Sequence, residues 1–171
     1  MWSRRTLHEC ASELESVSKQ FRNAYMNSHK IDSNRRDEMM REYSNRGVEL
    51  LRILALAIRS EQDAGRLMKL PARVGSFKDN VAHDEIALFP QYYRPPYKKV
   101  RSSKSLKLRD GLNKIAHADP GRSSFYADDT THDLILCGKN QGKYWIAILS
   151  ILDLCLVIKC MPDCEINKSD G

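Results

Sequence analysis

The stretch VELLRILALAI, residues 48–58, decides the fold that this sequence predicts. It is apolar on almost every side of a helix, which is typical of a helix enclosed by the rest of its domain. Helical spacing of apolar residues extends it over about residues 34–64, with Asp32 or Ser33 as a good N-cap and Gly65 as a natural stop. We therefore predict a long central helix here.

Further helices are predicted on both sides of the central one. Apolar residues in steps of three and four indicate an amphipathic helix over about residues 4–28. Another helix begins after Ser103 or Ser105 and ends by Ala118, because the next residue precedes a proline. A last helix is predicted over about residues 149–161, although pattern alone does not separate strand from helix in that apolar run.

The segments between these helices complete the predicted fold. Residues 66–103 hold several prolines and are predicted to form a long connection that lies against the helices, with a short helix near residues 79–89. The stretch HDLILCGKNQGKYWIAI, residues 132–148, has two short apolar runs joined by a Gly-containing turn, which indicates a β-hairpin. The sequence thus predicts a mainly α fold in a single domain over residues 1–171: a bundle of four to five helices with a small β-hairpin before the last helix.

Composition and charge restrict the class of protein. A net charge of +6 favours an anionic partner without identifying one. The N-terminus has no apolar run of the signal-peptide kind, and the longest apolar run, broken by Ser150 and Asp153, falls short of the roughly 18 residues that a membrane span needs. We expect a cytoplasmic protein with no membrane partner. The five cysteines lack a zinc-binding spacing, so we expect buried or incidental thiols and no metal.

The stretch SLKLRDGLNKIAHADPG, residues 105–121, carries the candidate catalytic residues. Arg109, Asn113 and His117 stand four apart, so they share one face of a helix. An imidazole can move a proton near neutral pH, a guanidinium can hold phosphate oxygens, and an amide can orient either, which together suit a phosphodiester. The same row also fits the polar side of an ordinary amphipathic helix, with His117 as a ligand of the helix C-terminus.

The segment LRDGLNKIAHA, residues 108–118, preceded by two long helices and followed by a hairpin and a last helix, resembles the HEPN superfamily of small helical-bundle proteins. The mark of that family is an Arg, a polar residue and, a few residues later, a His near a helix end. The resemblance implies an HEPN-like bundle, a homodimer whose motifs meet across the interface, and a metal-independent endoribonuclease without cofactor, of a toxin or phage-defence type. Asn113 and His117 match the motif. Leu112 stands where the family has Arg, so Arg109 would have to supply the guanidinium from one turn earlier.

These roles form a specific catalytic hypothesis. His117 would be the general base on the RNA 2′-hydroxyl, Arg109 would stabilise the phosphorane-like charge, and Asn113 would position the phosphate. The predicted product is a cyclic 2′,3′-phosphate. If Arg109 does not replace the missing arginine, the site is degenerate.

A basic, tyrosine-rich run leads into this helix. The stretch QYYRPPYKKVRSSKSLKLR, residues 91–109, is dense in lysine and arginine and has no acid. Cations contact phosphates without sequence preference, and tyrosines stack on unpaired bases. The predicted RNA-binding residues are Tyr92, Tyr93, Arg94, Tyr97, Lys98, Lys99, Arg101, Lys104 and Lys107. A solvated loop whose tyrosines pack on the bundle explains the same composition.

Two other functions therefore stay open. One is a catalytically inactive helical module that binds a partner protein or a nucleic acid through its basic surface. The other is an antitoxin-like or regulatory protein whose surface charge serves complex formation with another protein.

Overall fold

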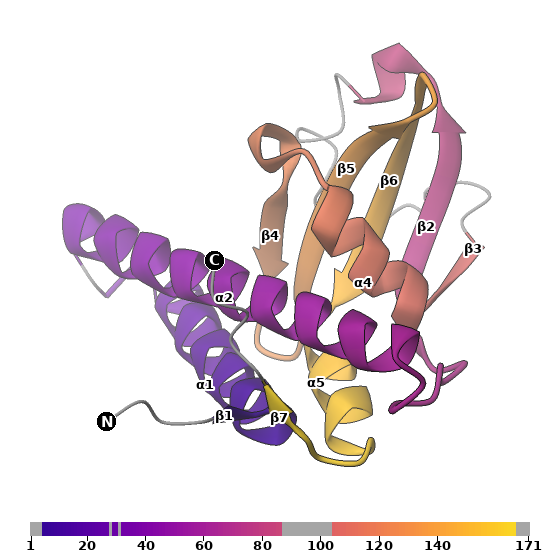
Figure 1. The fold of residues 1–171 in the computed structure, drawn as a ribbon. Helices are drawn as coiled ribbons and strands as arrows, with labels where there is room; N and C mark the ends of the chain where they lie inside the picture. The colour runs from indigo at the N-terminus through magenta and orange to yellow at the C-terminus, as the bar shows by residue number, and fades with distance from the viewer. Residues whose placement is uncertain (1–4, 28, 31, 87–103, 167–171) are drawn as a thin grey trace.

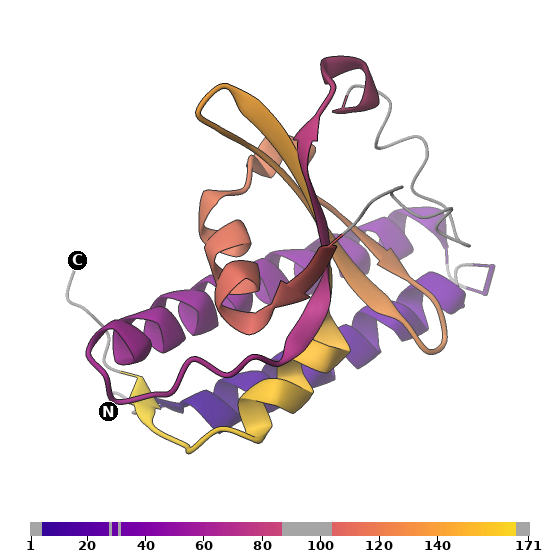
Figure 2. The same ribbon diagram turned by 90° about the vertical axis from the view of Figure 1, so that its right-hand side faces the viewer.

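Two long helices lie beside a five-stranded antiparallel sheet (Figures 1 and 2). The computed structural model describes residues 5–27, 29–30, 32–86 and 104–166. The long helices are α1 (Leu7–Met26) and α2 (Ser33–Asp63), and two shorter ones are α4 (Leu108–His117) and α5 (Ile151–Lys159). A single turn of 3-10 helix, η1 (Pro120–Arg122), follows α4.

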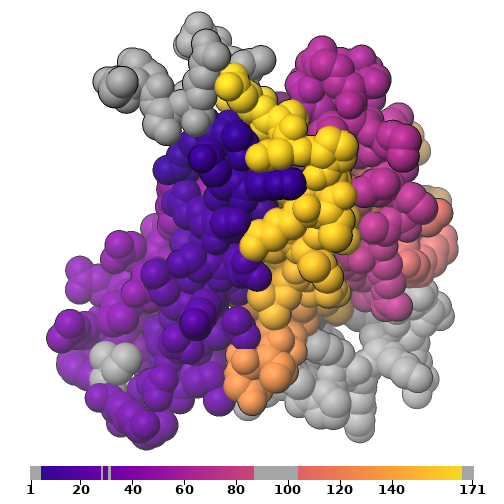
Figure 3. Space-filling view, turned by 90° about the horizontal axis from the view of Figure 1, so that it is seen from below, coloured from indigo at the N-terminus to yellow at the C-terminus, as the bar shows by residue number. Residues whose placement is uncertain are grey.

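Every pair of neighbouring strands in the five-stranded sheet is antiparallel. In spatial order the strands are β3 (Lys104–Lys107), β2 (Arg73–Val81), β6 (Lys143–Ser150), β5 (His132–Asn140) and β4 (Ser124–Ala127). A separate two-stranded sheet pairs β1 (Arg5–Thr6) with β7 (Glu165–Ile166) and so joins the two ends of the described chain. Figure 3 shows α5 and β7 lying along α1 on this side of the molecule.

The predicted mainly α, four- to five-helix HEPN-like bundle is wrong, because the fold is mixed α/β and the sheet is a complete layer of it. The region 66–103 is not simply a long connection, since it contains the nine-residue strand β2. The predicted helix start at Ser105 is also wrong, because Ser105 belongs to β3 and α4 begins at Leu108. Ser103, the other predicted start, lies outside the described residues. The individual helices 4–28, 34–64 and 149–161 are confirmed within a few residues.

The predicted hairpin is confirmed and lies at the centre of the sheet as β5 and β6. Its turn residues Gln141 and Gly142 have φ of 48° and 80°, the pair of positive values that a type I′ hairpin turn requires. All of His132–Gly138 is buried, because β5 is covered on both faces. A strand buried on both faces is continuously apolar instead of alternating, which explains the unbroken apolar run LILC in β5.

The core lies mainly between the sheet and the helices. Leu54 and Ile58 of α2 and Leu112 of α4 are fully buried there, together with Leu149 of β6. A second, smaller apolar cluster around Ile146 occupies the opposite face of the sheet. No helix in the described part of the chain is both long and apolar enough to cross a membrane.

Candidate functional site

The polar side of α4 faces a pocket of about 740 Å³ between α2 and the sheet, which we call the basic pocket. Its walls come from α2, α4 and the strands β2, β5 and β6, which are far apart in the sequence. It is lined by Arg59, Phe77, Arg109, Asp110, Asn113, Lys114, His117, Lys139, Asn140 and Trp145. Most of the polar side chains in this set are cationic or amide-bearing.

The predicted row Arg109, Asn113 and His117 does line one pocket, as its four-residue spacing predicts. Leu112 is fully buried in the core on the opposite side of α4. An arginine at that position would therefore bury its charge in apolar surroundings, so the core of this fold requires an apolar residue there.

Arg109 is already engaged by the end of α2. Its Nη2 donates to both carboxylate oxygens of Asp63 at 2.8 and 3.1 Å. Its Nη1 donates to the Arg59 carbonyl at 3.1 Å and to the Gln62 side chain at 3.3 Å. The hydrogen bond from Arg109 holds the pKa of Asp63 below its ordinary value. Most of the guanidinium donors are thus used to join α4 to α2.

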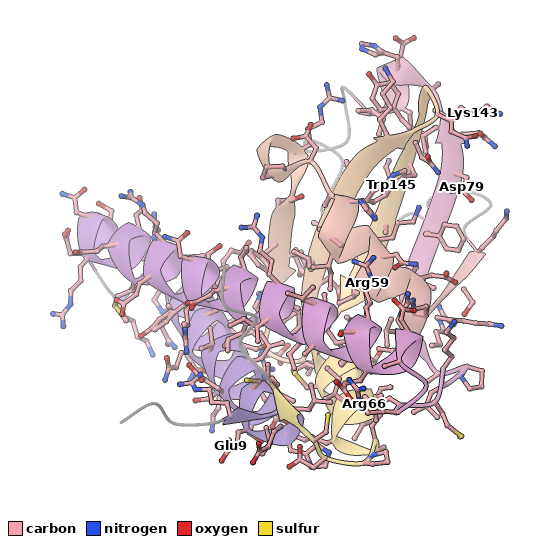
Figure 4. The ribbon with its side chains drawn as sticks, in the orientation of Figure 1. Glu9, Arg59, Arg66, Asp79, Lys143 and Trp145 are labelled. Atoms are coloured by element: carbon pink, nitrogen blue, oxygen red, sulfur yellow. The ribbon has the colours of Figure 1, made fainter. Side chains whose placement is uncertain are left out.

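Lys114 lies at the base of the basic pocket on an aromatic platform. Its Nζ lies 4.1 Å from the ring centroid of Trp145 and 5.3 Å from that of Phe77, within cation–π range. Burial lowers the pKa of Lys114, opposed by Asp79, whose Oδ1 lies 3.8 Å away. Figure 4 shows Asp79 and Trp145 on neighbouring strands of the sheet and Arg59 on α2.

A glycine fixes the position of the tryptophan. Gly138 of β5 is the cross-strand partner of Trp145, and a Cβ added at Gly138 would lie 2.2 Å from the indole Cζ2. The indole therefore lies directly across the bare backbone of Gly138. This close approach is what places the ring beneath Lys114.

Two cations of the basic pocket lack a carboxylate partner. Neither Arg59 nor Lys139 forms an ion pair with another described residue, and the buried Arg59 Nε makes no hydrogen bond there either. His117 is exposed on the rim, and its ring makes no hydrogen bond within the described ranges. These three side chains are available to an anionic ligand.

A second pocket of about 260 Å³ continues the basic surface past the end of α4. It shares His117 and Lys139 with the basic pocket and adds Ala118, Asp119, Arg122, Gly138 and Tyr144. Arg122 Nε lies 3.6 Å from Asp119 Oδ2, so this arginine is paired, whereas Lys139 forms no ion pair with another described residue. Arg122 Cζ lies 5.5 Å, and Lys139 Nζ 5.2 Å, from the Tyr144 ring centroid. We call the two adjoining pockets the basic track.

No protein-family model, curated protein or solved structure matches this chain. In the parts of the chain that the structure describes, no group of three or more His, Cys, Asp or Glu residues is arranged to hold a metal ion.

Only the end of the predicted RNA-binding run can be placed. Tyr92, Tyr93, Arg94, Tyr97, Lys98, Lys99 and Arg101 lie outside the described residues. Lys104 and Lys107 are exposed at the two ends of β3, and Lys104 Nζ lies 5.9 Å from the ring centroid of Phe77. The described end of the basic run therefore lies in β3, at the edge of the basic pocket.

Several pocket residues were not predicted from the sequence. Arg59, Lys139 and Trp145 come from α2 and the central hairpin, and only strand pairing and helix packing bring them to α4. Lys114 lies three residues before His117 on the same helix, so helical spacing would have suggested it.

Proposed function

We propose that this protein binds single-stranded RNA along the basic track. The observation that carries the proposal is the convergence of Arg59, Lys114 and Lys139, from three separate elements, on one concave surface. Among the described residues, neither Arg59 nor Lys139 forms an ion pair with a carboxylate. Phosphates are the anions that a row of separated cations matches best. Lys104, at the start of β3, adds a further cation beside Phe77 of the same pocket.

Aromatic and amide groups support a nucleic acid over a simple anion. The rings of Phe77 and Tyr144 are only partly buried, and a base would stack on the part of each ring that the neighbouring lysines and Arg122 leave exposed. Asn113 and Asn140 place amide groups in the basic pocket, where they can meet base edges. Pockets that hold one drug-sized ligand have volumes of roughly 300–1,000 Å³. The two pockets of the track, of 740 and 260 Å³, therefore have room for about two nucleotides.

Salt titration of RNA binding tests the proposal. A fluorescent single-stranded RNA is titrated with wild type, Lys139→Gln and Arg59→Gln, with Lys19→Gln as the control, because Lys19 is an exposed lysine of α1 that lines neither pocket of the track. Each track variant should weaken binding by about tenfold and reduce the slope of log affinity against log salt by about 0.7. Equal affinity for all four proteins would refute the proposal.

RNA cleavage is a second candidate, favoured by the position of His117. Its exposed imidazole stands where the two pockets of the track meet. As general base it would remove the proton of a 2′-hydroxyl, the oxygen would attack the adjacent phosphorus, and the 5′-oxygen would leave, giving a cyclic 2′,3′-phosphate. Because Arg109 is bound to Asp63, Lys139 would take over the stabilising of phosphorane charge.

The partners predicted from the sequence fit the same surface. A protein partner or antitoxin covering the basic track would compete with RNA, and a homodimer would place two tracks in one particle. A cytoplasmic location is part of the same proposal, because it would give the track access to RNA.

A further inference from the structure

A second cavity, of about 490 Å³, lies between α2 and the β4 edge of the sheet, and we call it the apolar pocket. Apolar side chains from α2, α4, β4 and β5 form most of its wall, among them Val48, Leu51, Ile115, Phe125 and Leu136. Among the described residues, it shares none with the basic pocket and only Ala118 with the smaller pocket of the track. It is therefore a separate site.

The polar residues of the apolar pocket are cationic or hydroxylic. Arg41 and Arg52 both line it, and they lie on the same face of α2, about 16 Å apart along the helix axis. Neither arginine forms an ion pair with another described residue. Ser44 lies one turn after Arg41 on the same face. Ser123, at the end of η1, and Ser124, the first residue of β4, line the pocket as well.

The charges around the apolar pocket indicate which kind of ligand it would bind. None of the described residues that line the apolar pocket is an Asp or Glu, so both arginines present an uncompensated positive charge at an apolar cavity. Exposed apolar surface favours an apolar ligand, and a guanidinium beside hydroxyl groups favours a carboxylate, which it can bind through two hydrogen bonds. A volume of 490 Å³ lies within the range of small-molecule sites.

We propose that the apolar pocket binds a long-chain monocarboxylate, with its acyl chain among Val48, Leu51 and Leu136 and its carboxylate on Arg41 or Arg52. The proposal does not rest on RNA binding, because a different set of residues carries it. The two arginines stand at opposite ends of the α2 wall, so single variants will identify the end that holds the carboxylate.

Calorimetric titration with three probes of equal chain length tests the proposal. Dodecanoate should bind one to one and saturate, whereas dodecyltrimethylammonium and dodecanol should bind at least tenfold more weakly. The double variant Arg41→Gln/Arg52→Gln should weaken dodecanoate binding at least tenfold and abolish the preference for the anion. The matched control Lys19→Gln/Arg35→Gln removes the same charge from exposed positions that do not line the apolar pocket and should bind as wild type does.

A variant that fills the cavity provides an independent measurement. Ser44→Phe places a ring in the pocket without changing the charge and should abolish dodecanoate binding while RNA binding persists. Equal binding of the anionic and cationic probes would overturn the proposal, as would unchanged binding in the arginine double variant or in a folded Ser44→Phe protein. Non-saturating uptake of dodecanoate would overturn it as well.

Discussion

Replacing Gly138 with alanine should disturb both the fold and the proposed RNA site. The added Cβ would lie 2.2 Å from Cζ2 and 2.5 Å from Cε2 of Trp145. Ordinary carbon–carbon contact begins near 3.5 Å, so the indole must retreat by about 1.3 Å. Trp145 is only 4% exposed and is packed in the main core, which leaves it little room to move.

The expected cost follows from overpacking of a well-filled core. Such changes destabilise proteins by about 1–3 kcal/mol. In a domain of this size each kcal/mol lowers the melting temperature by about 2–4 °C, so Gly138→Ala should melt roughly 2–12 °C below wild type. Displacing the indole also removes the platform under Lys114, and RNA affinity should fall in protein that is still folded at the assay temperature.

Thermal and urea unfolding measure the first effect, with Gly47→Ala as the matched control. Gly47 lies inside α2, and a Cβ there would meet only Val17 Cγ1 at an ordinary 3.9 Å. Alanine is favoured over glycine in a helix, so this variant should gain about 0.5–1 kcal/mol. If Gly138→Ala is as stable as wild type, or if its melting temperature falls no more than that of a substitution at an exposed position, the close contact between Trp145 and the β5 backbone is refuted.

Three further substitutions test other parts of the structure. Asp63→Asn should destabilise the protein at neutral pH, because the depressed pKa of Asp63 contributes stability while its carboxylate is charged. This difference from wild type should shrink as the pH falls below the ordinary carboxyl pKa of about 4 and vanish below the depressed pKa of the folded state. Urea midpoints measured across pH test this. Burial lowers the pKa of His132 to about 4 from 6.5, so the unfolded chain takes up the proton first, and about 3 kcal/mol of stability should be lost as the pH falls from 6.5 to 4. Urea unfolding of His132→Gln should lack that part of the pH dependence, and an identical pH profile would contradict the assignment. His117→Ala should bind RNA within a few-fold of wild type, whereas any metal-independent cleavage, followed in EDTA by the appearance of cyclic phosphate ends, should disappear; undiminished cleavage would exclude His117 as the base.

The helices could be predicted because their signals are local. The stripe of α1 and the nearly all-apolar segment 48–58 of α2 follow the helical period over many turns, and Pro120 marks the end of α4. The β5–β6 hairpin has an equally local signal in its Gly-containing turn. Each of these elements can be recognised without knowledge of any distant partner.

The rest of the sheet has no such local signal. Residues 73–81, RVGSFKDNV, are mostly polar and only partly buried, and they form β2 because they pair with β6, about 70 positions later in the chain. Residues 104–107 could equally begin a helix, and only pairing with β2 makes them β3. The predicted fold class therefore included the β5–β6 hairpin but omitted β2, β3 and β4.

In the candidate site, too, features within one helix were predictable and contacts between distant elements were not. Helical spacing was enough to place Arg109, Asn113 and His117 on one pocket, but it could not show that Asp63 holds the arginine. The aromatic platform of Lys114 depends on Gly138 and Trp145 facing each other across two strands. A residue's neighbours on its own helix were predictable, and the groups facing it from other elements were not.

Salt dependence separates the two proposed ligands, because they differ in how many charges they neutralise. An RNA held by Arg59, Lys114 and Lys139 would displace counterions from about three phosphates, which predicts a slope of log affinity against log salt near −2. A monocarboxylate meets a single guanidinium, and most of its affinity comes from the burial of its chain, which salt does not weaken. Its affinity should therefore change little over the same salt range. A steep slope for dodecanoate, or a flat one for RNA, would mean that the ligand occupies a different surface from the one proposed for it.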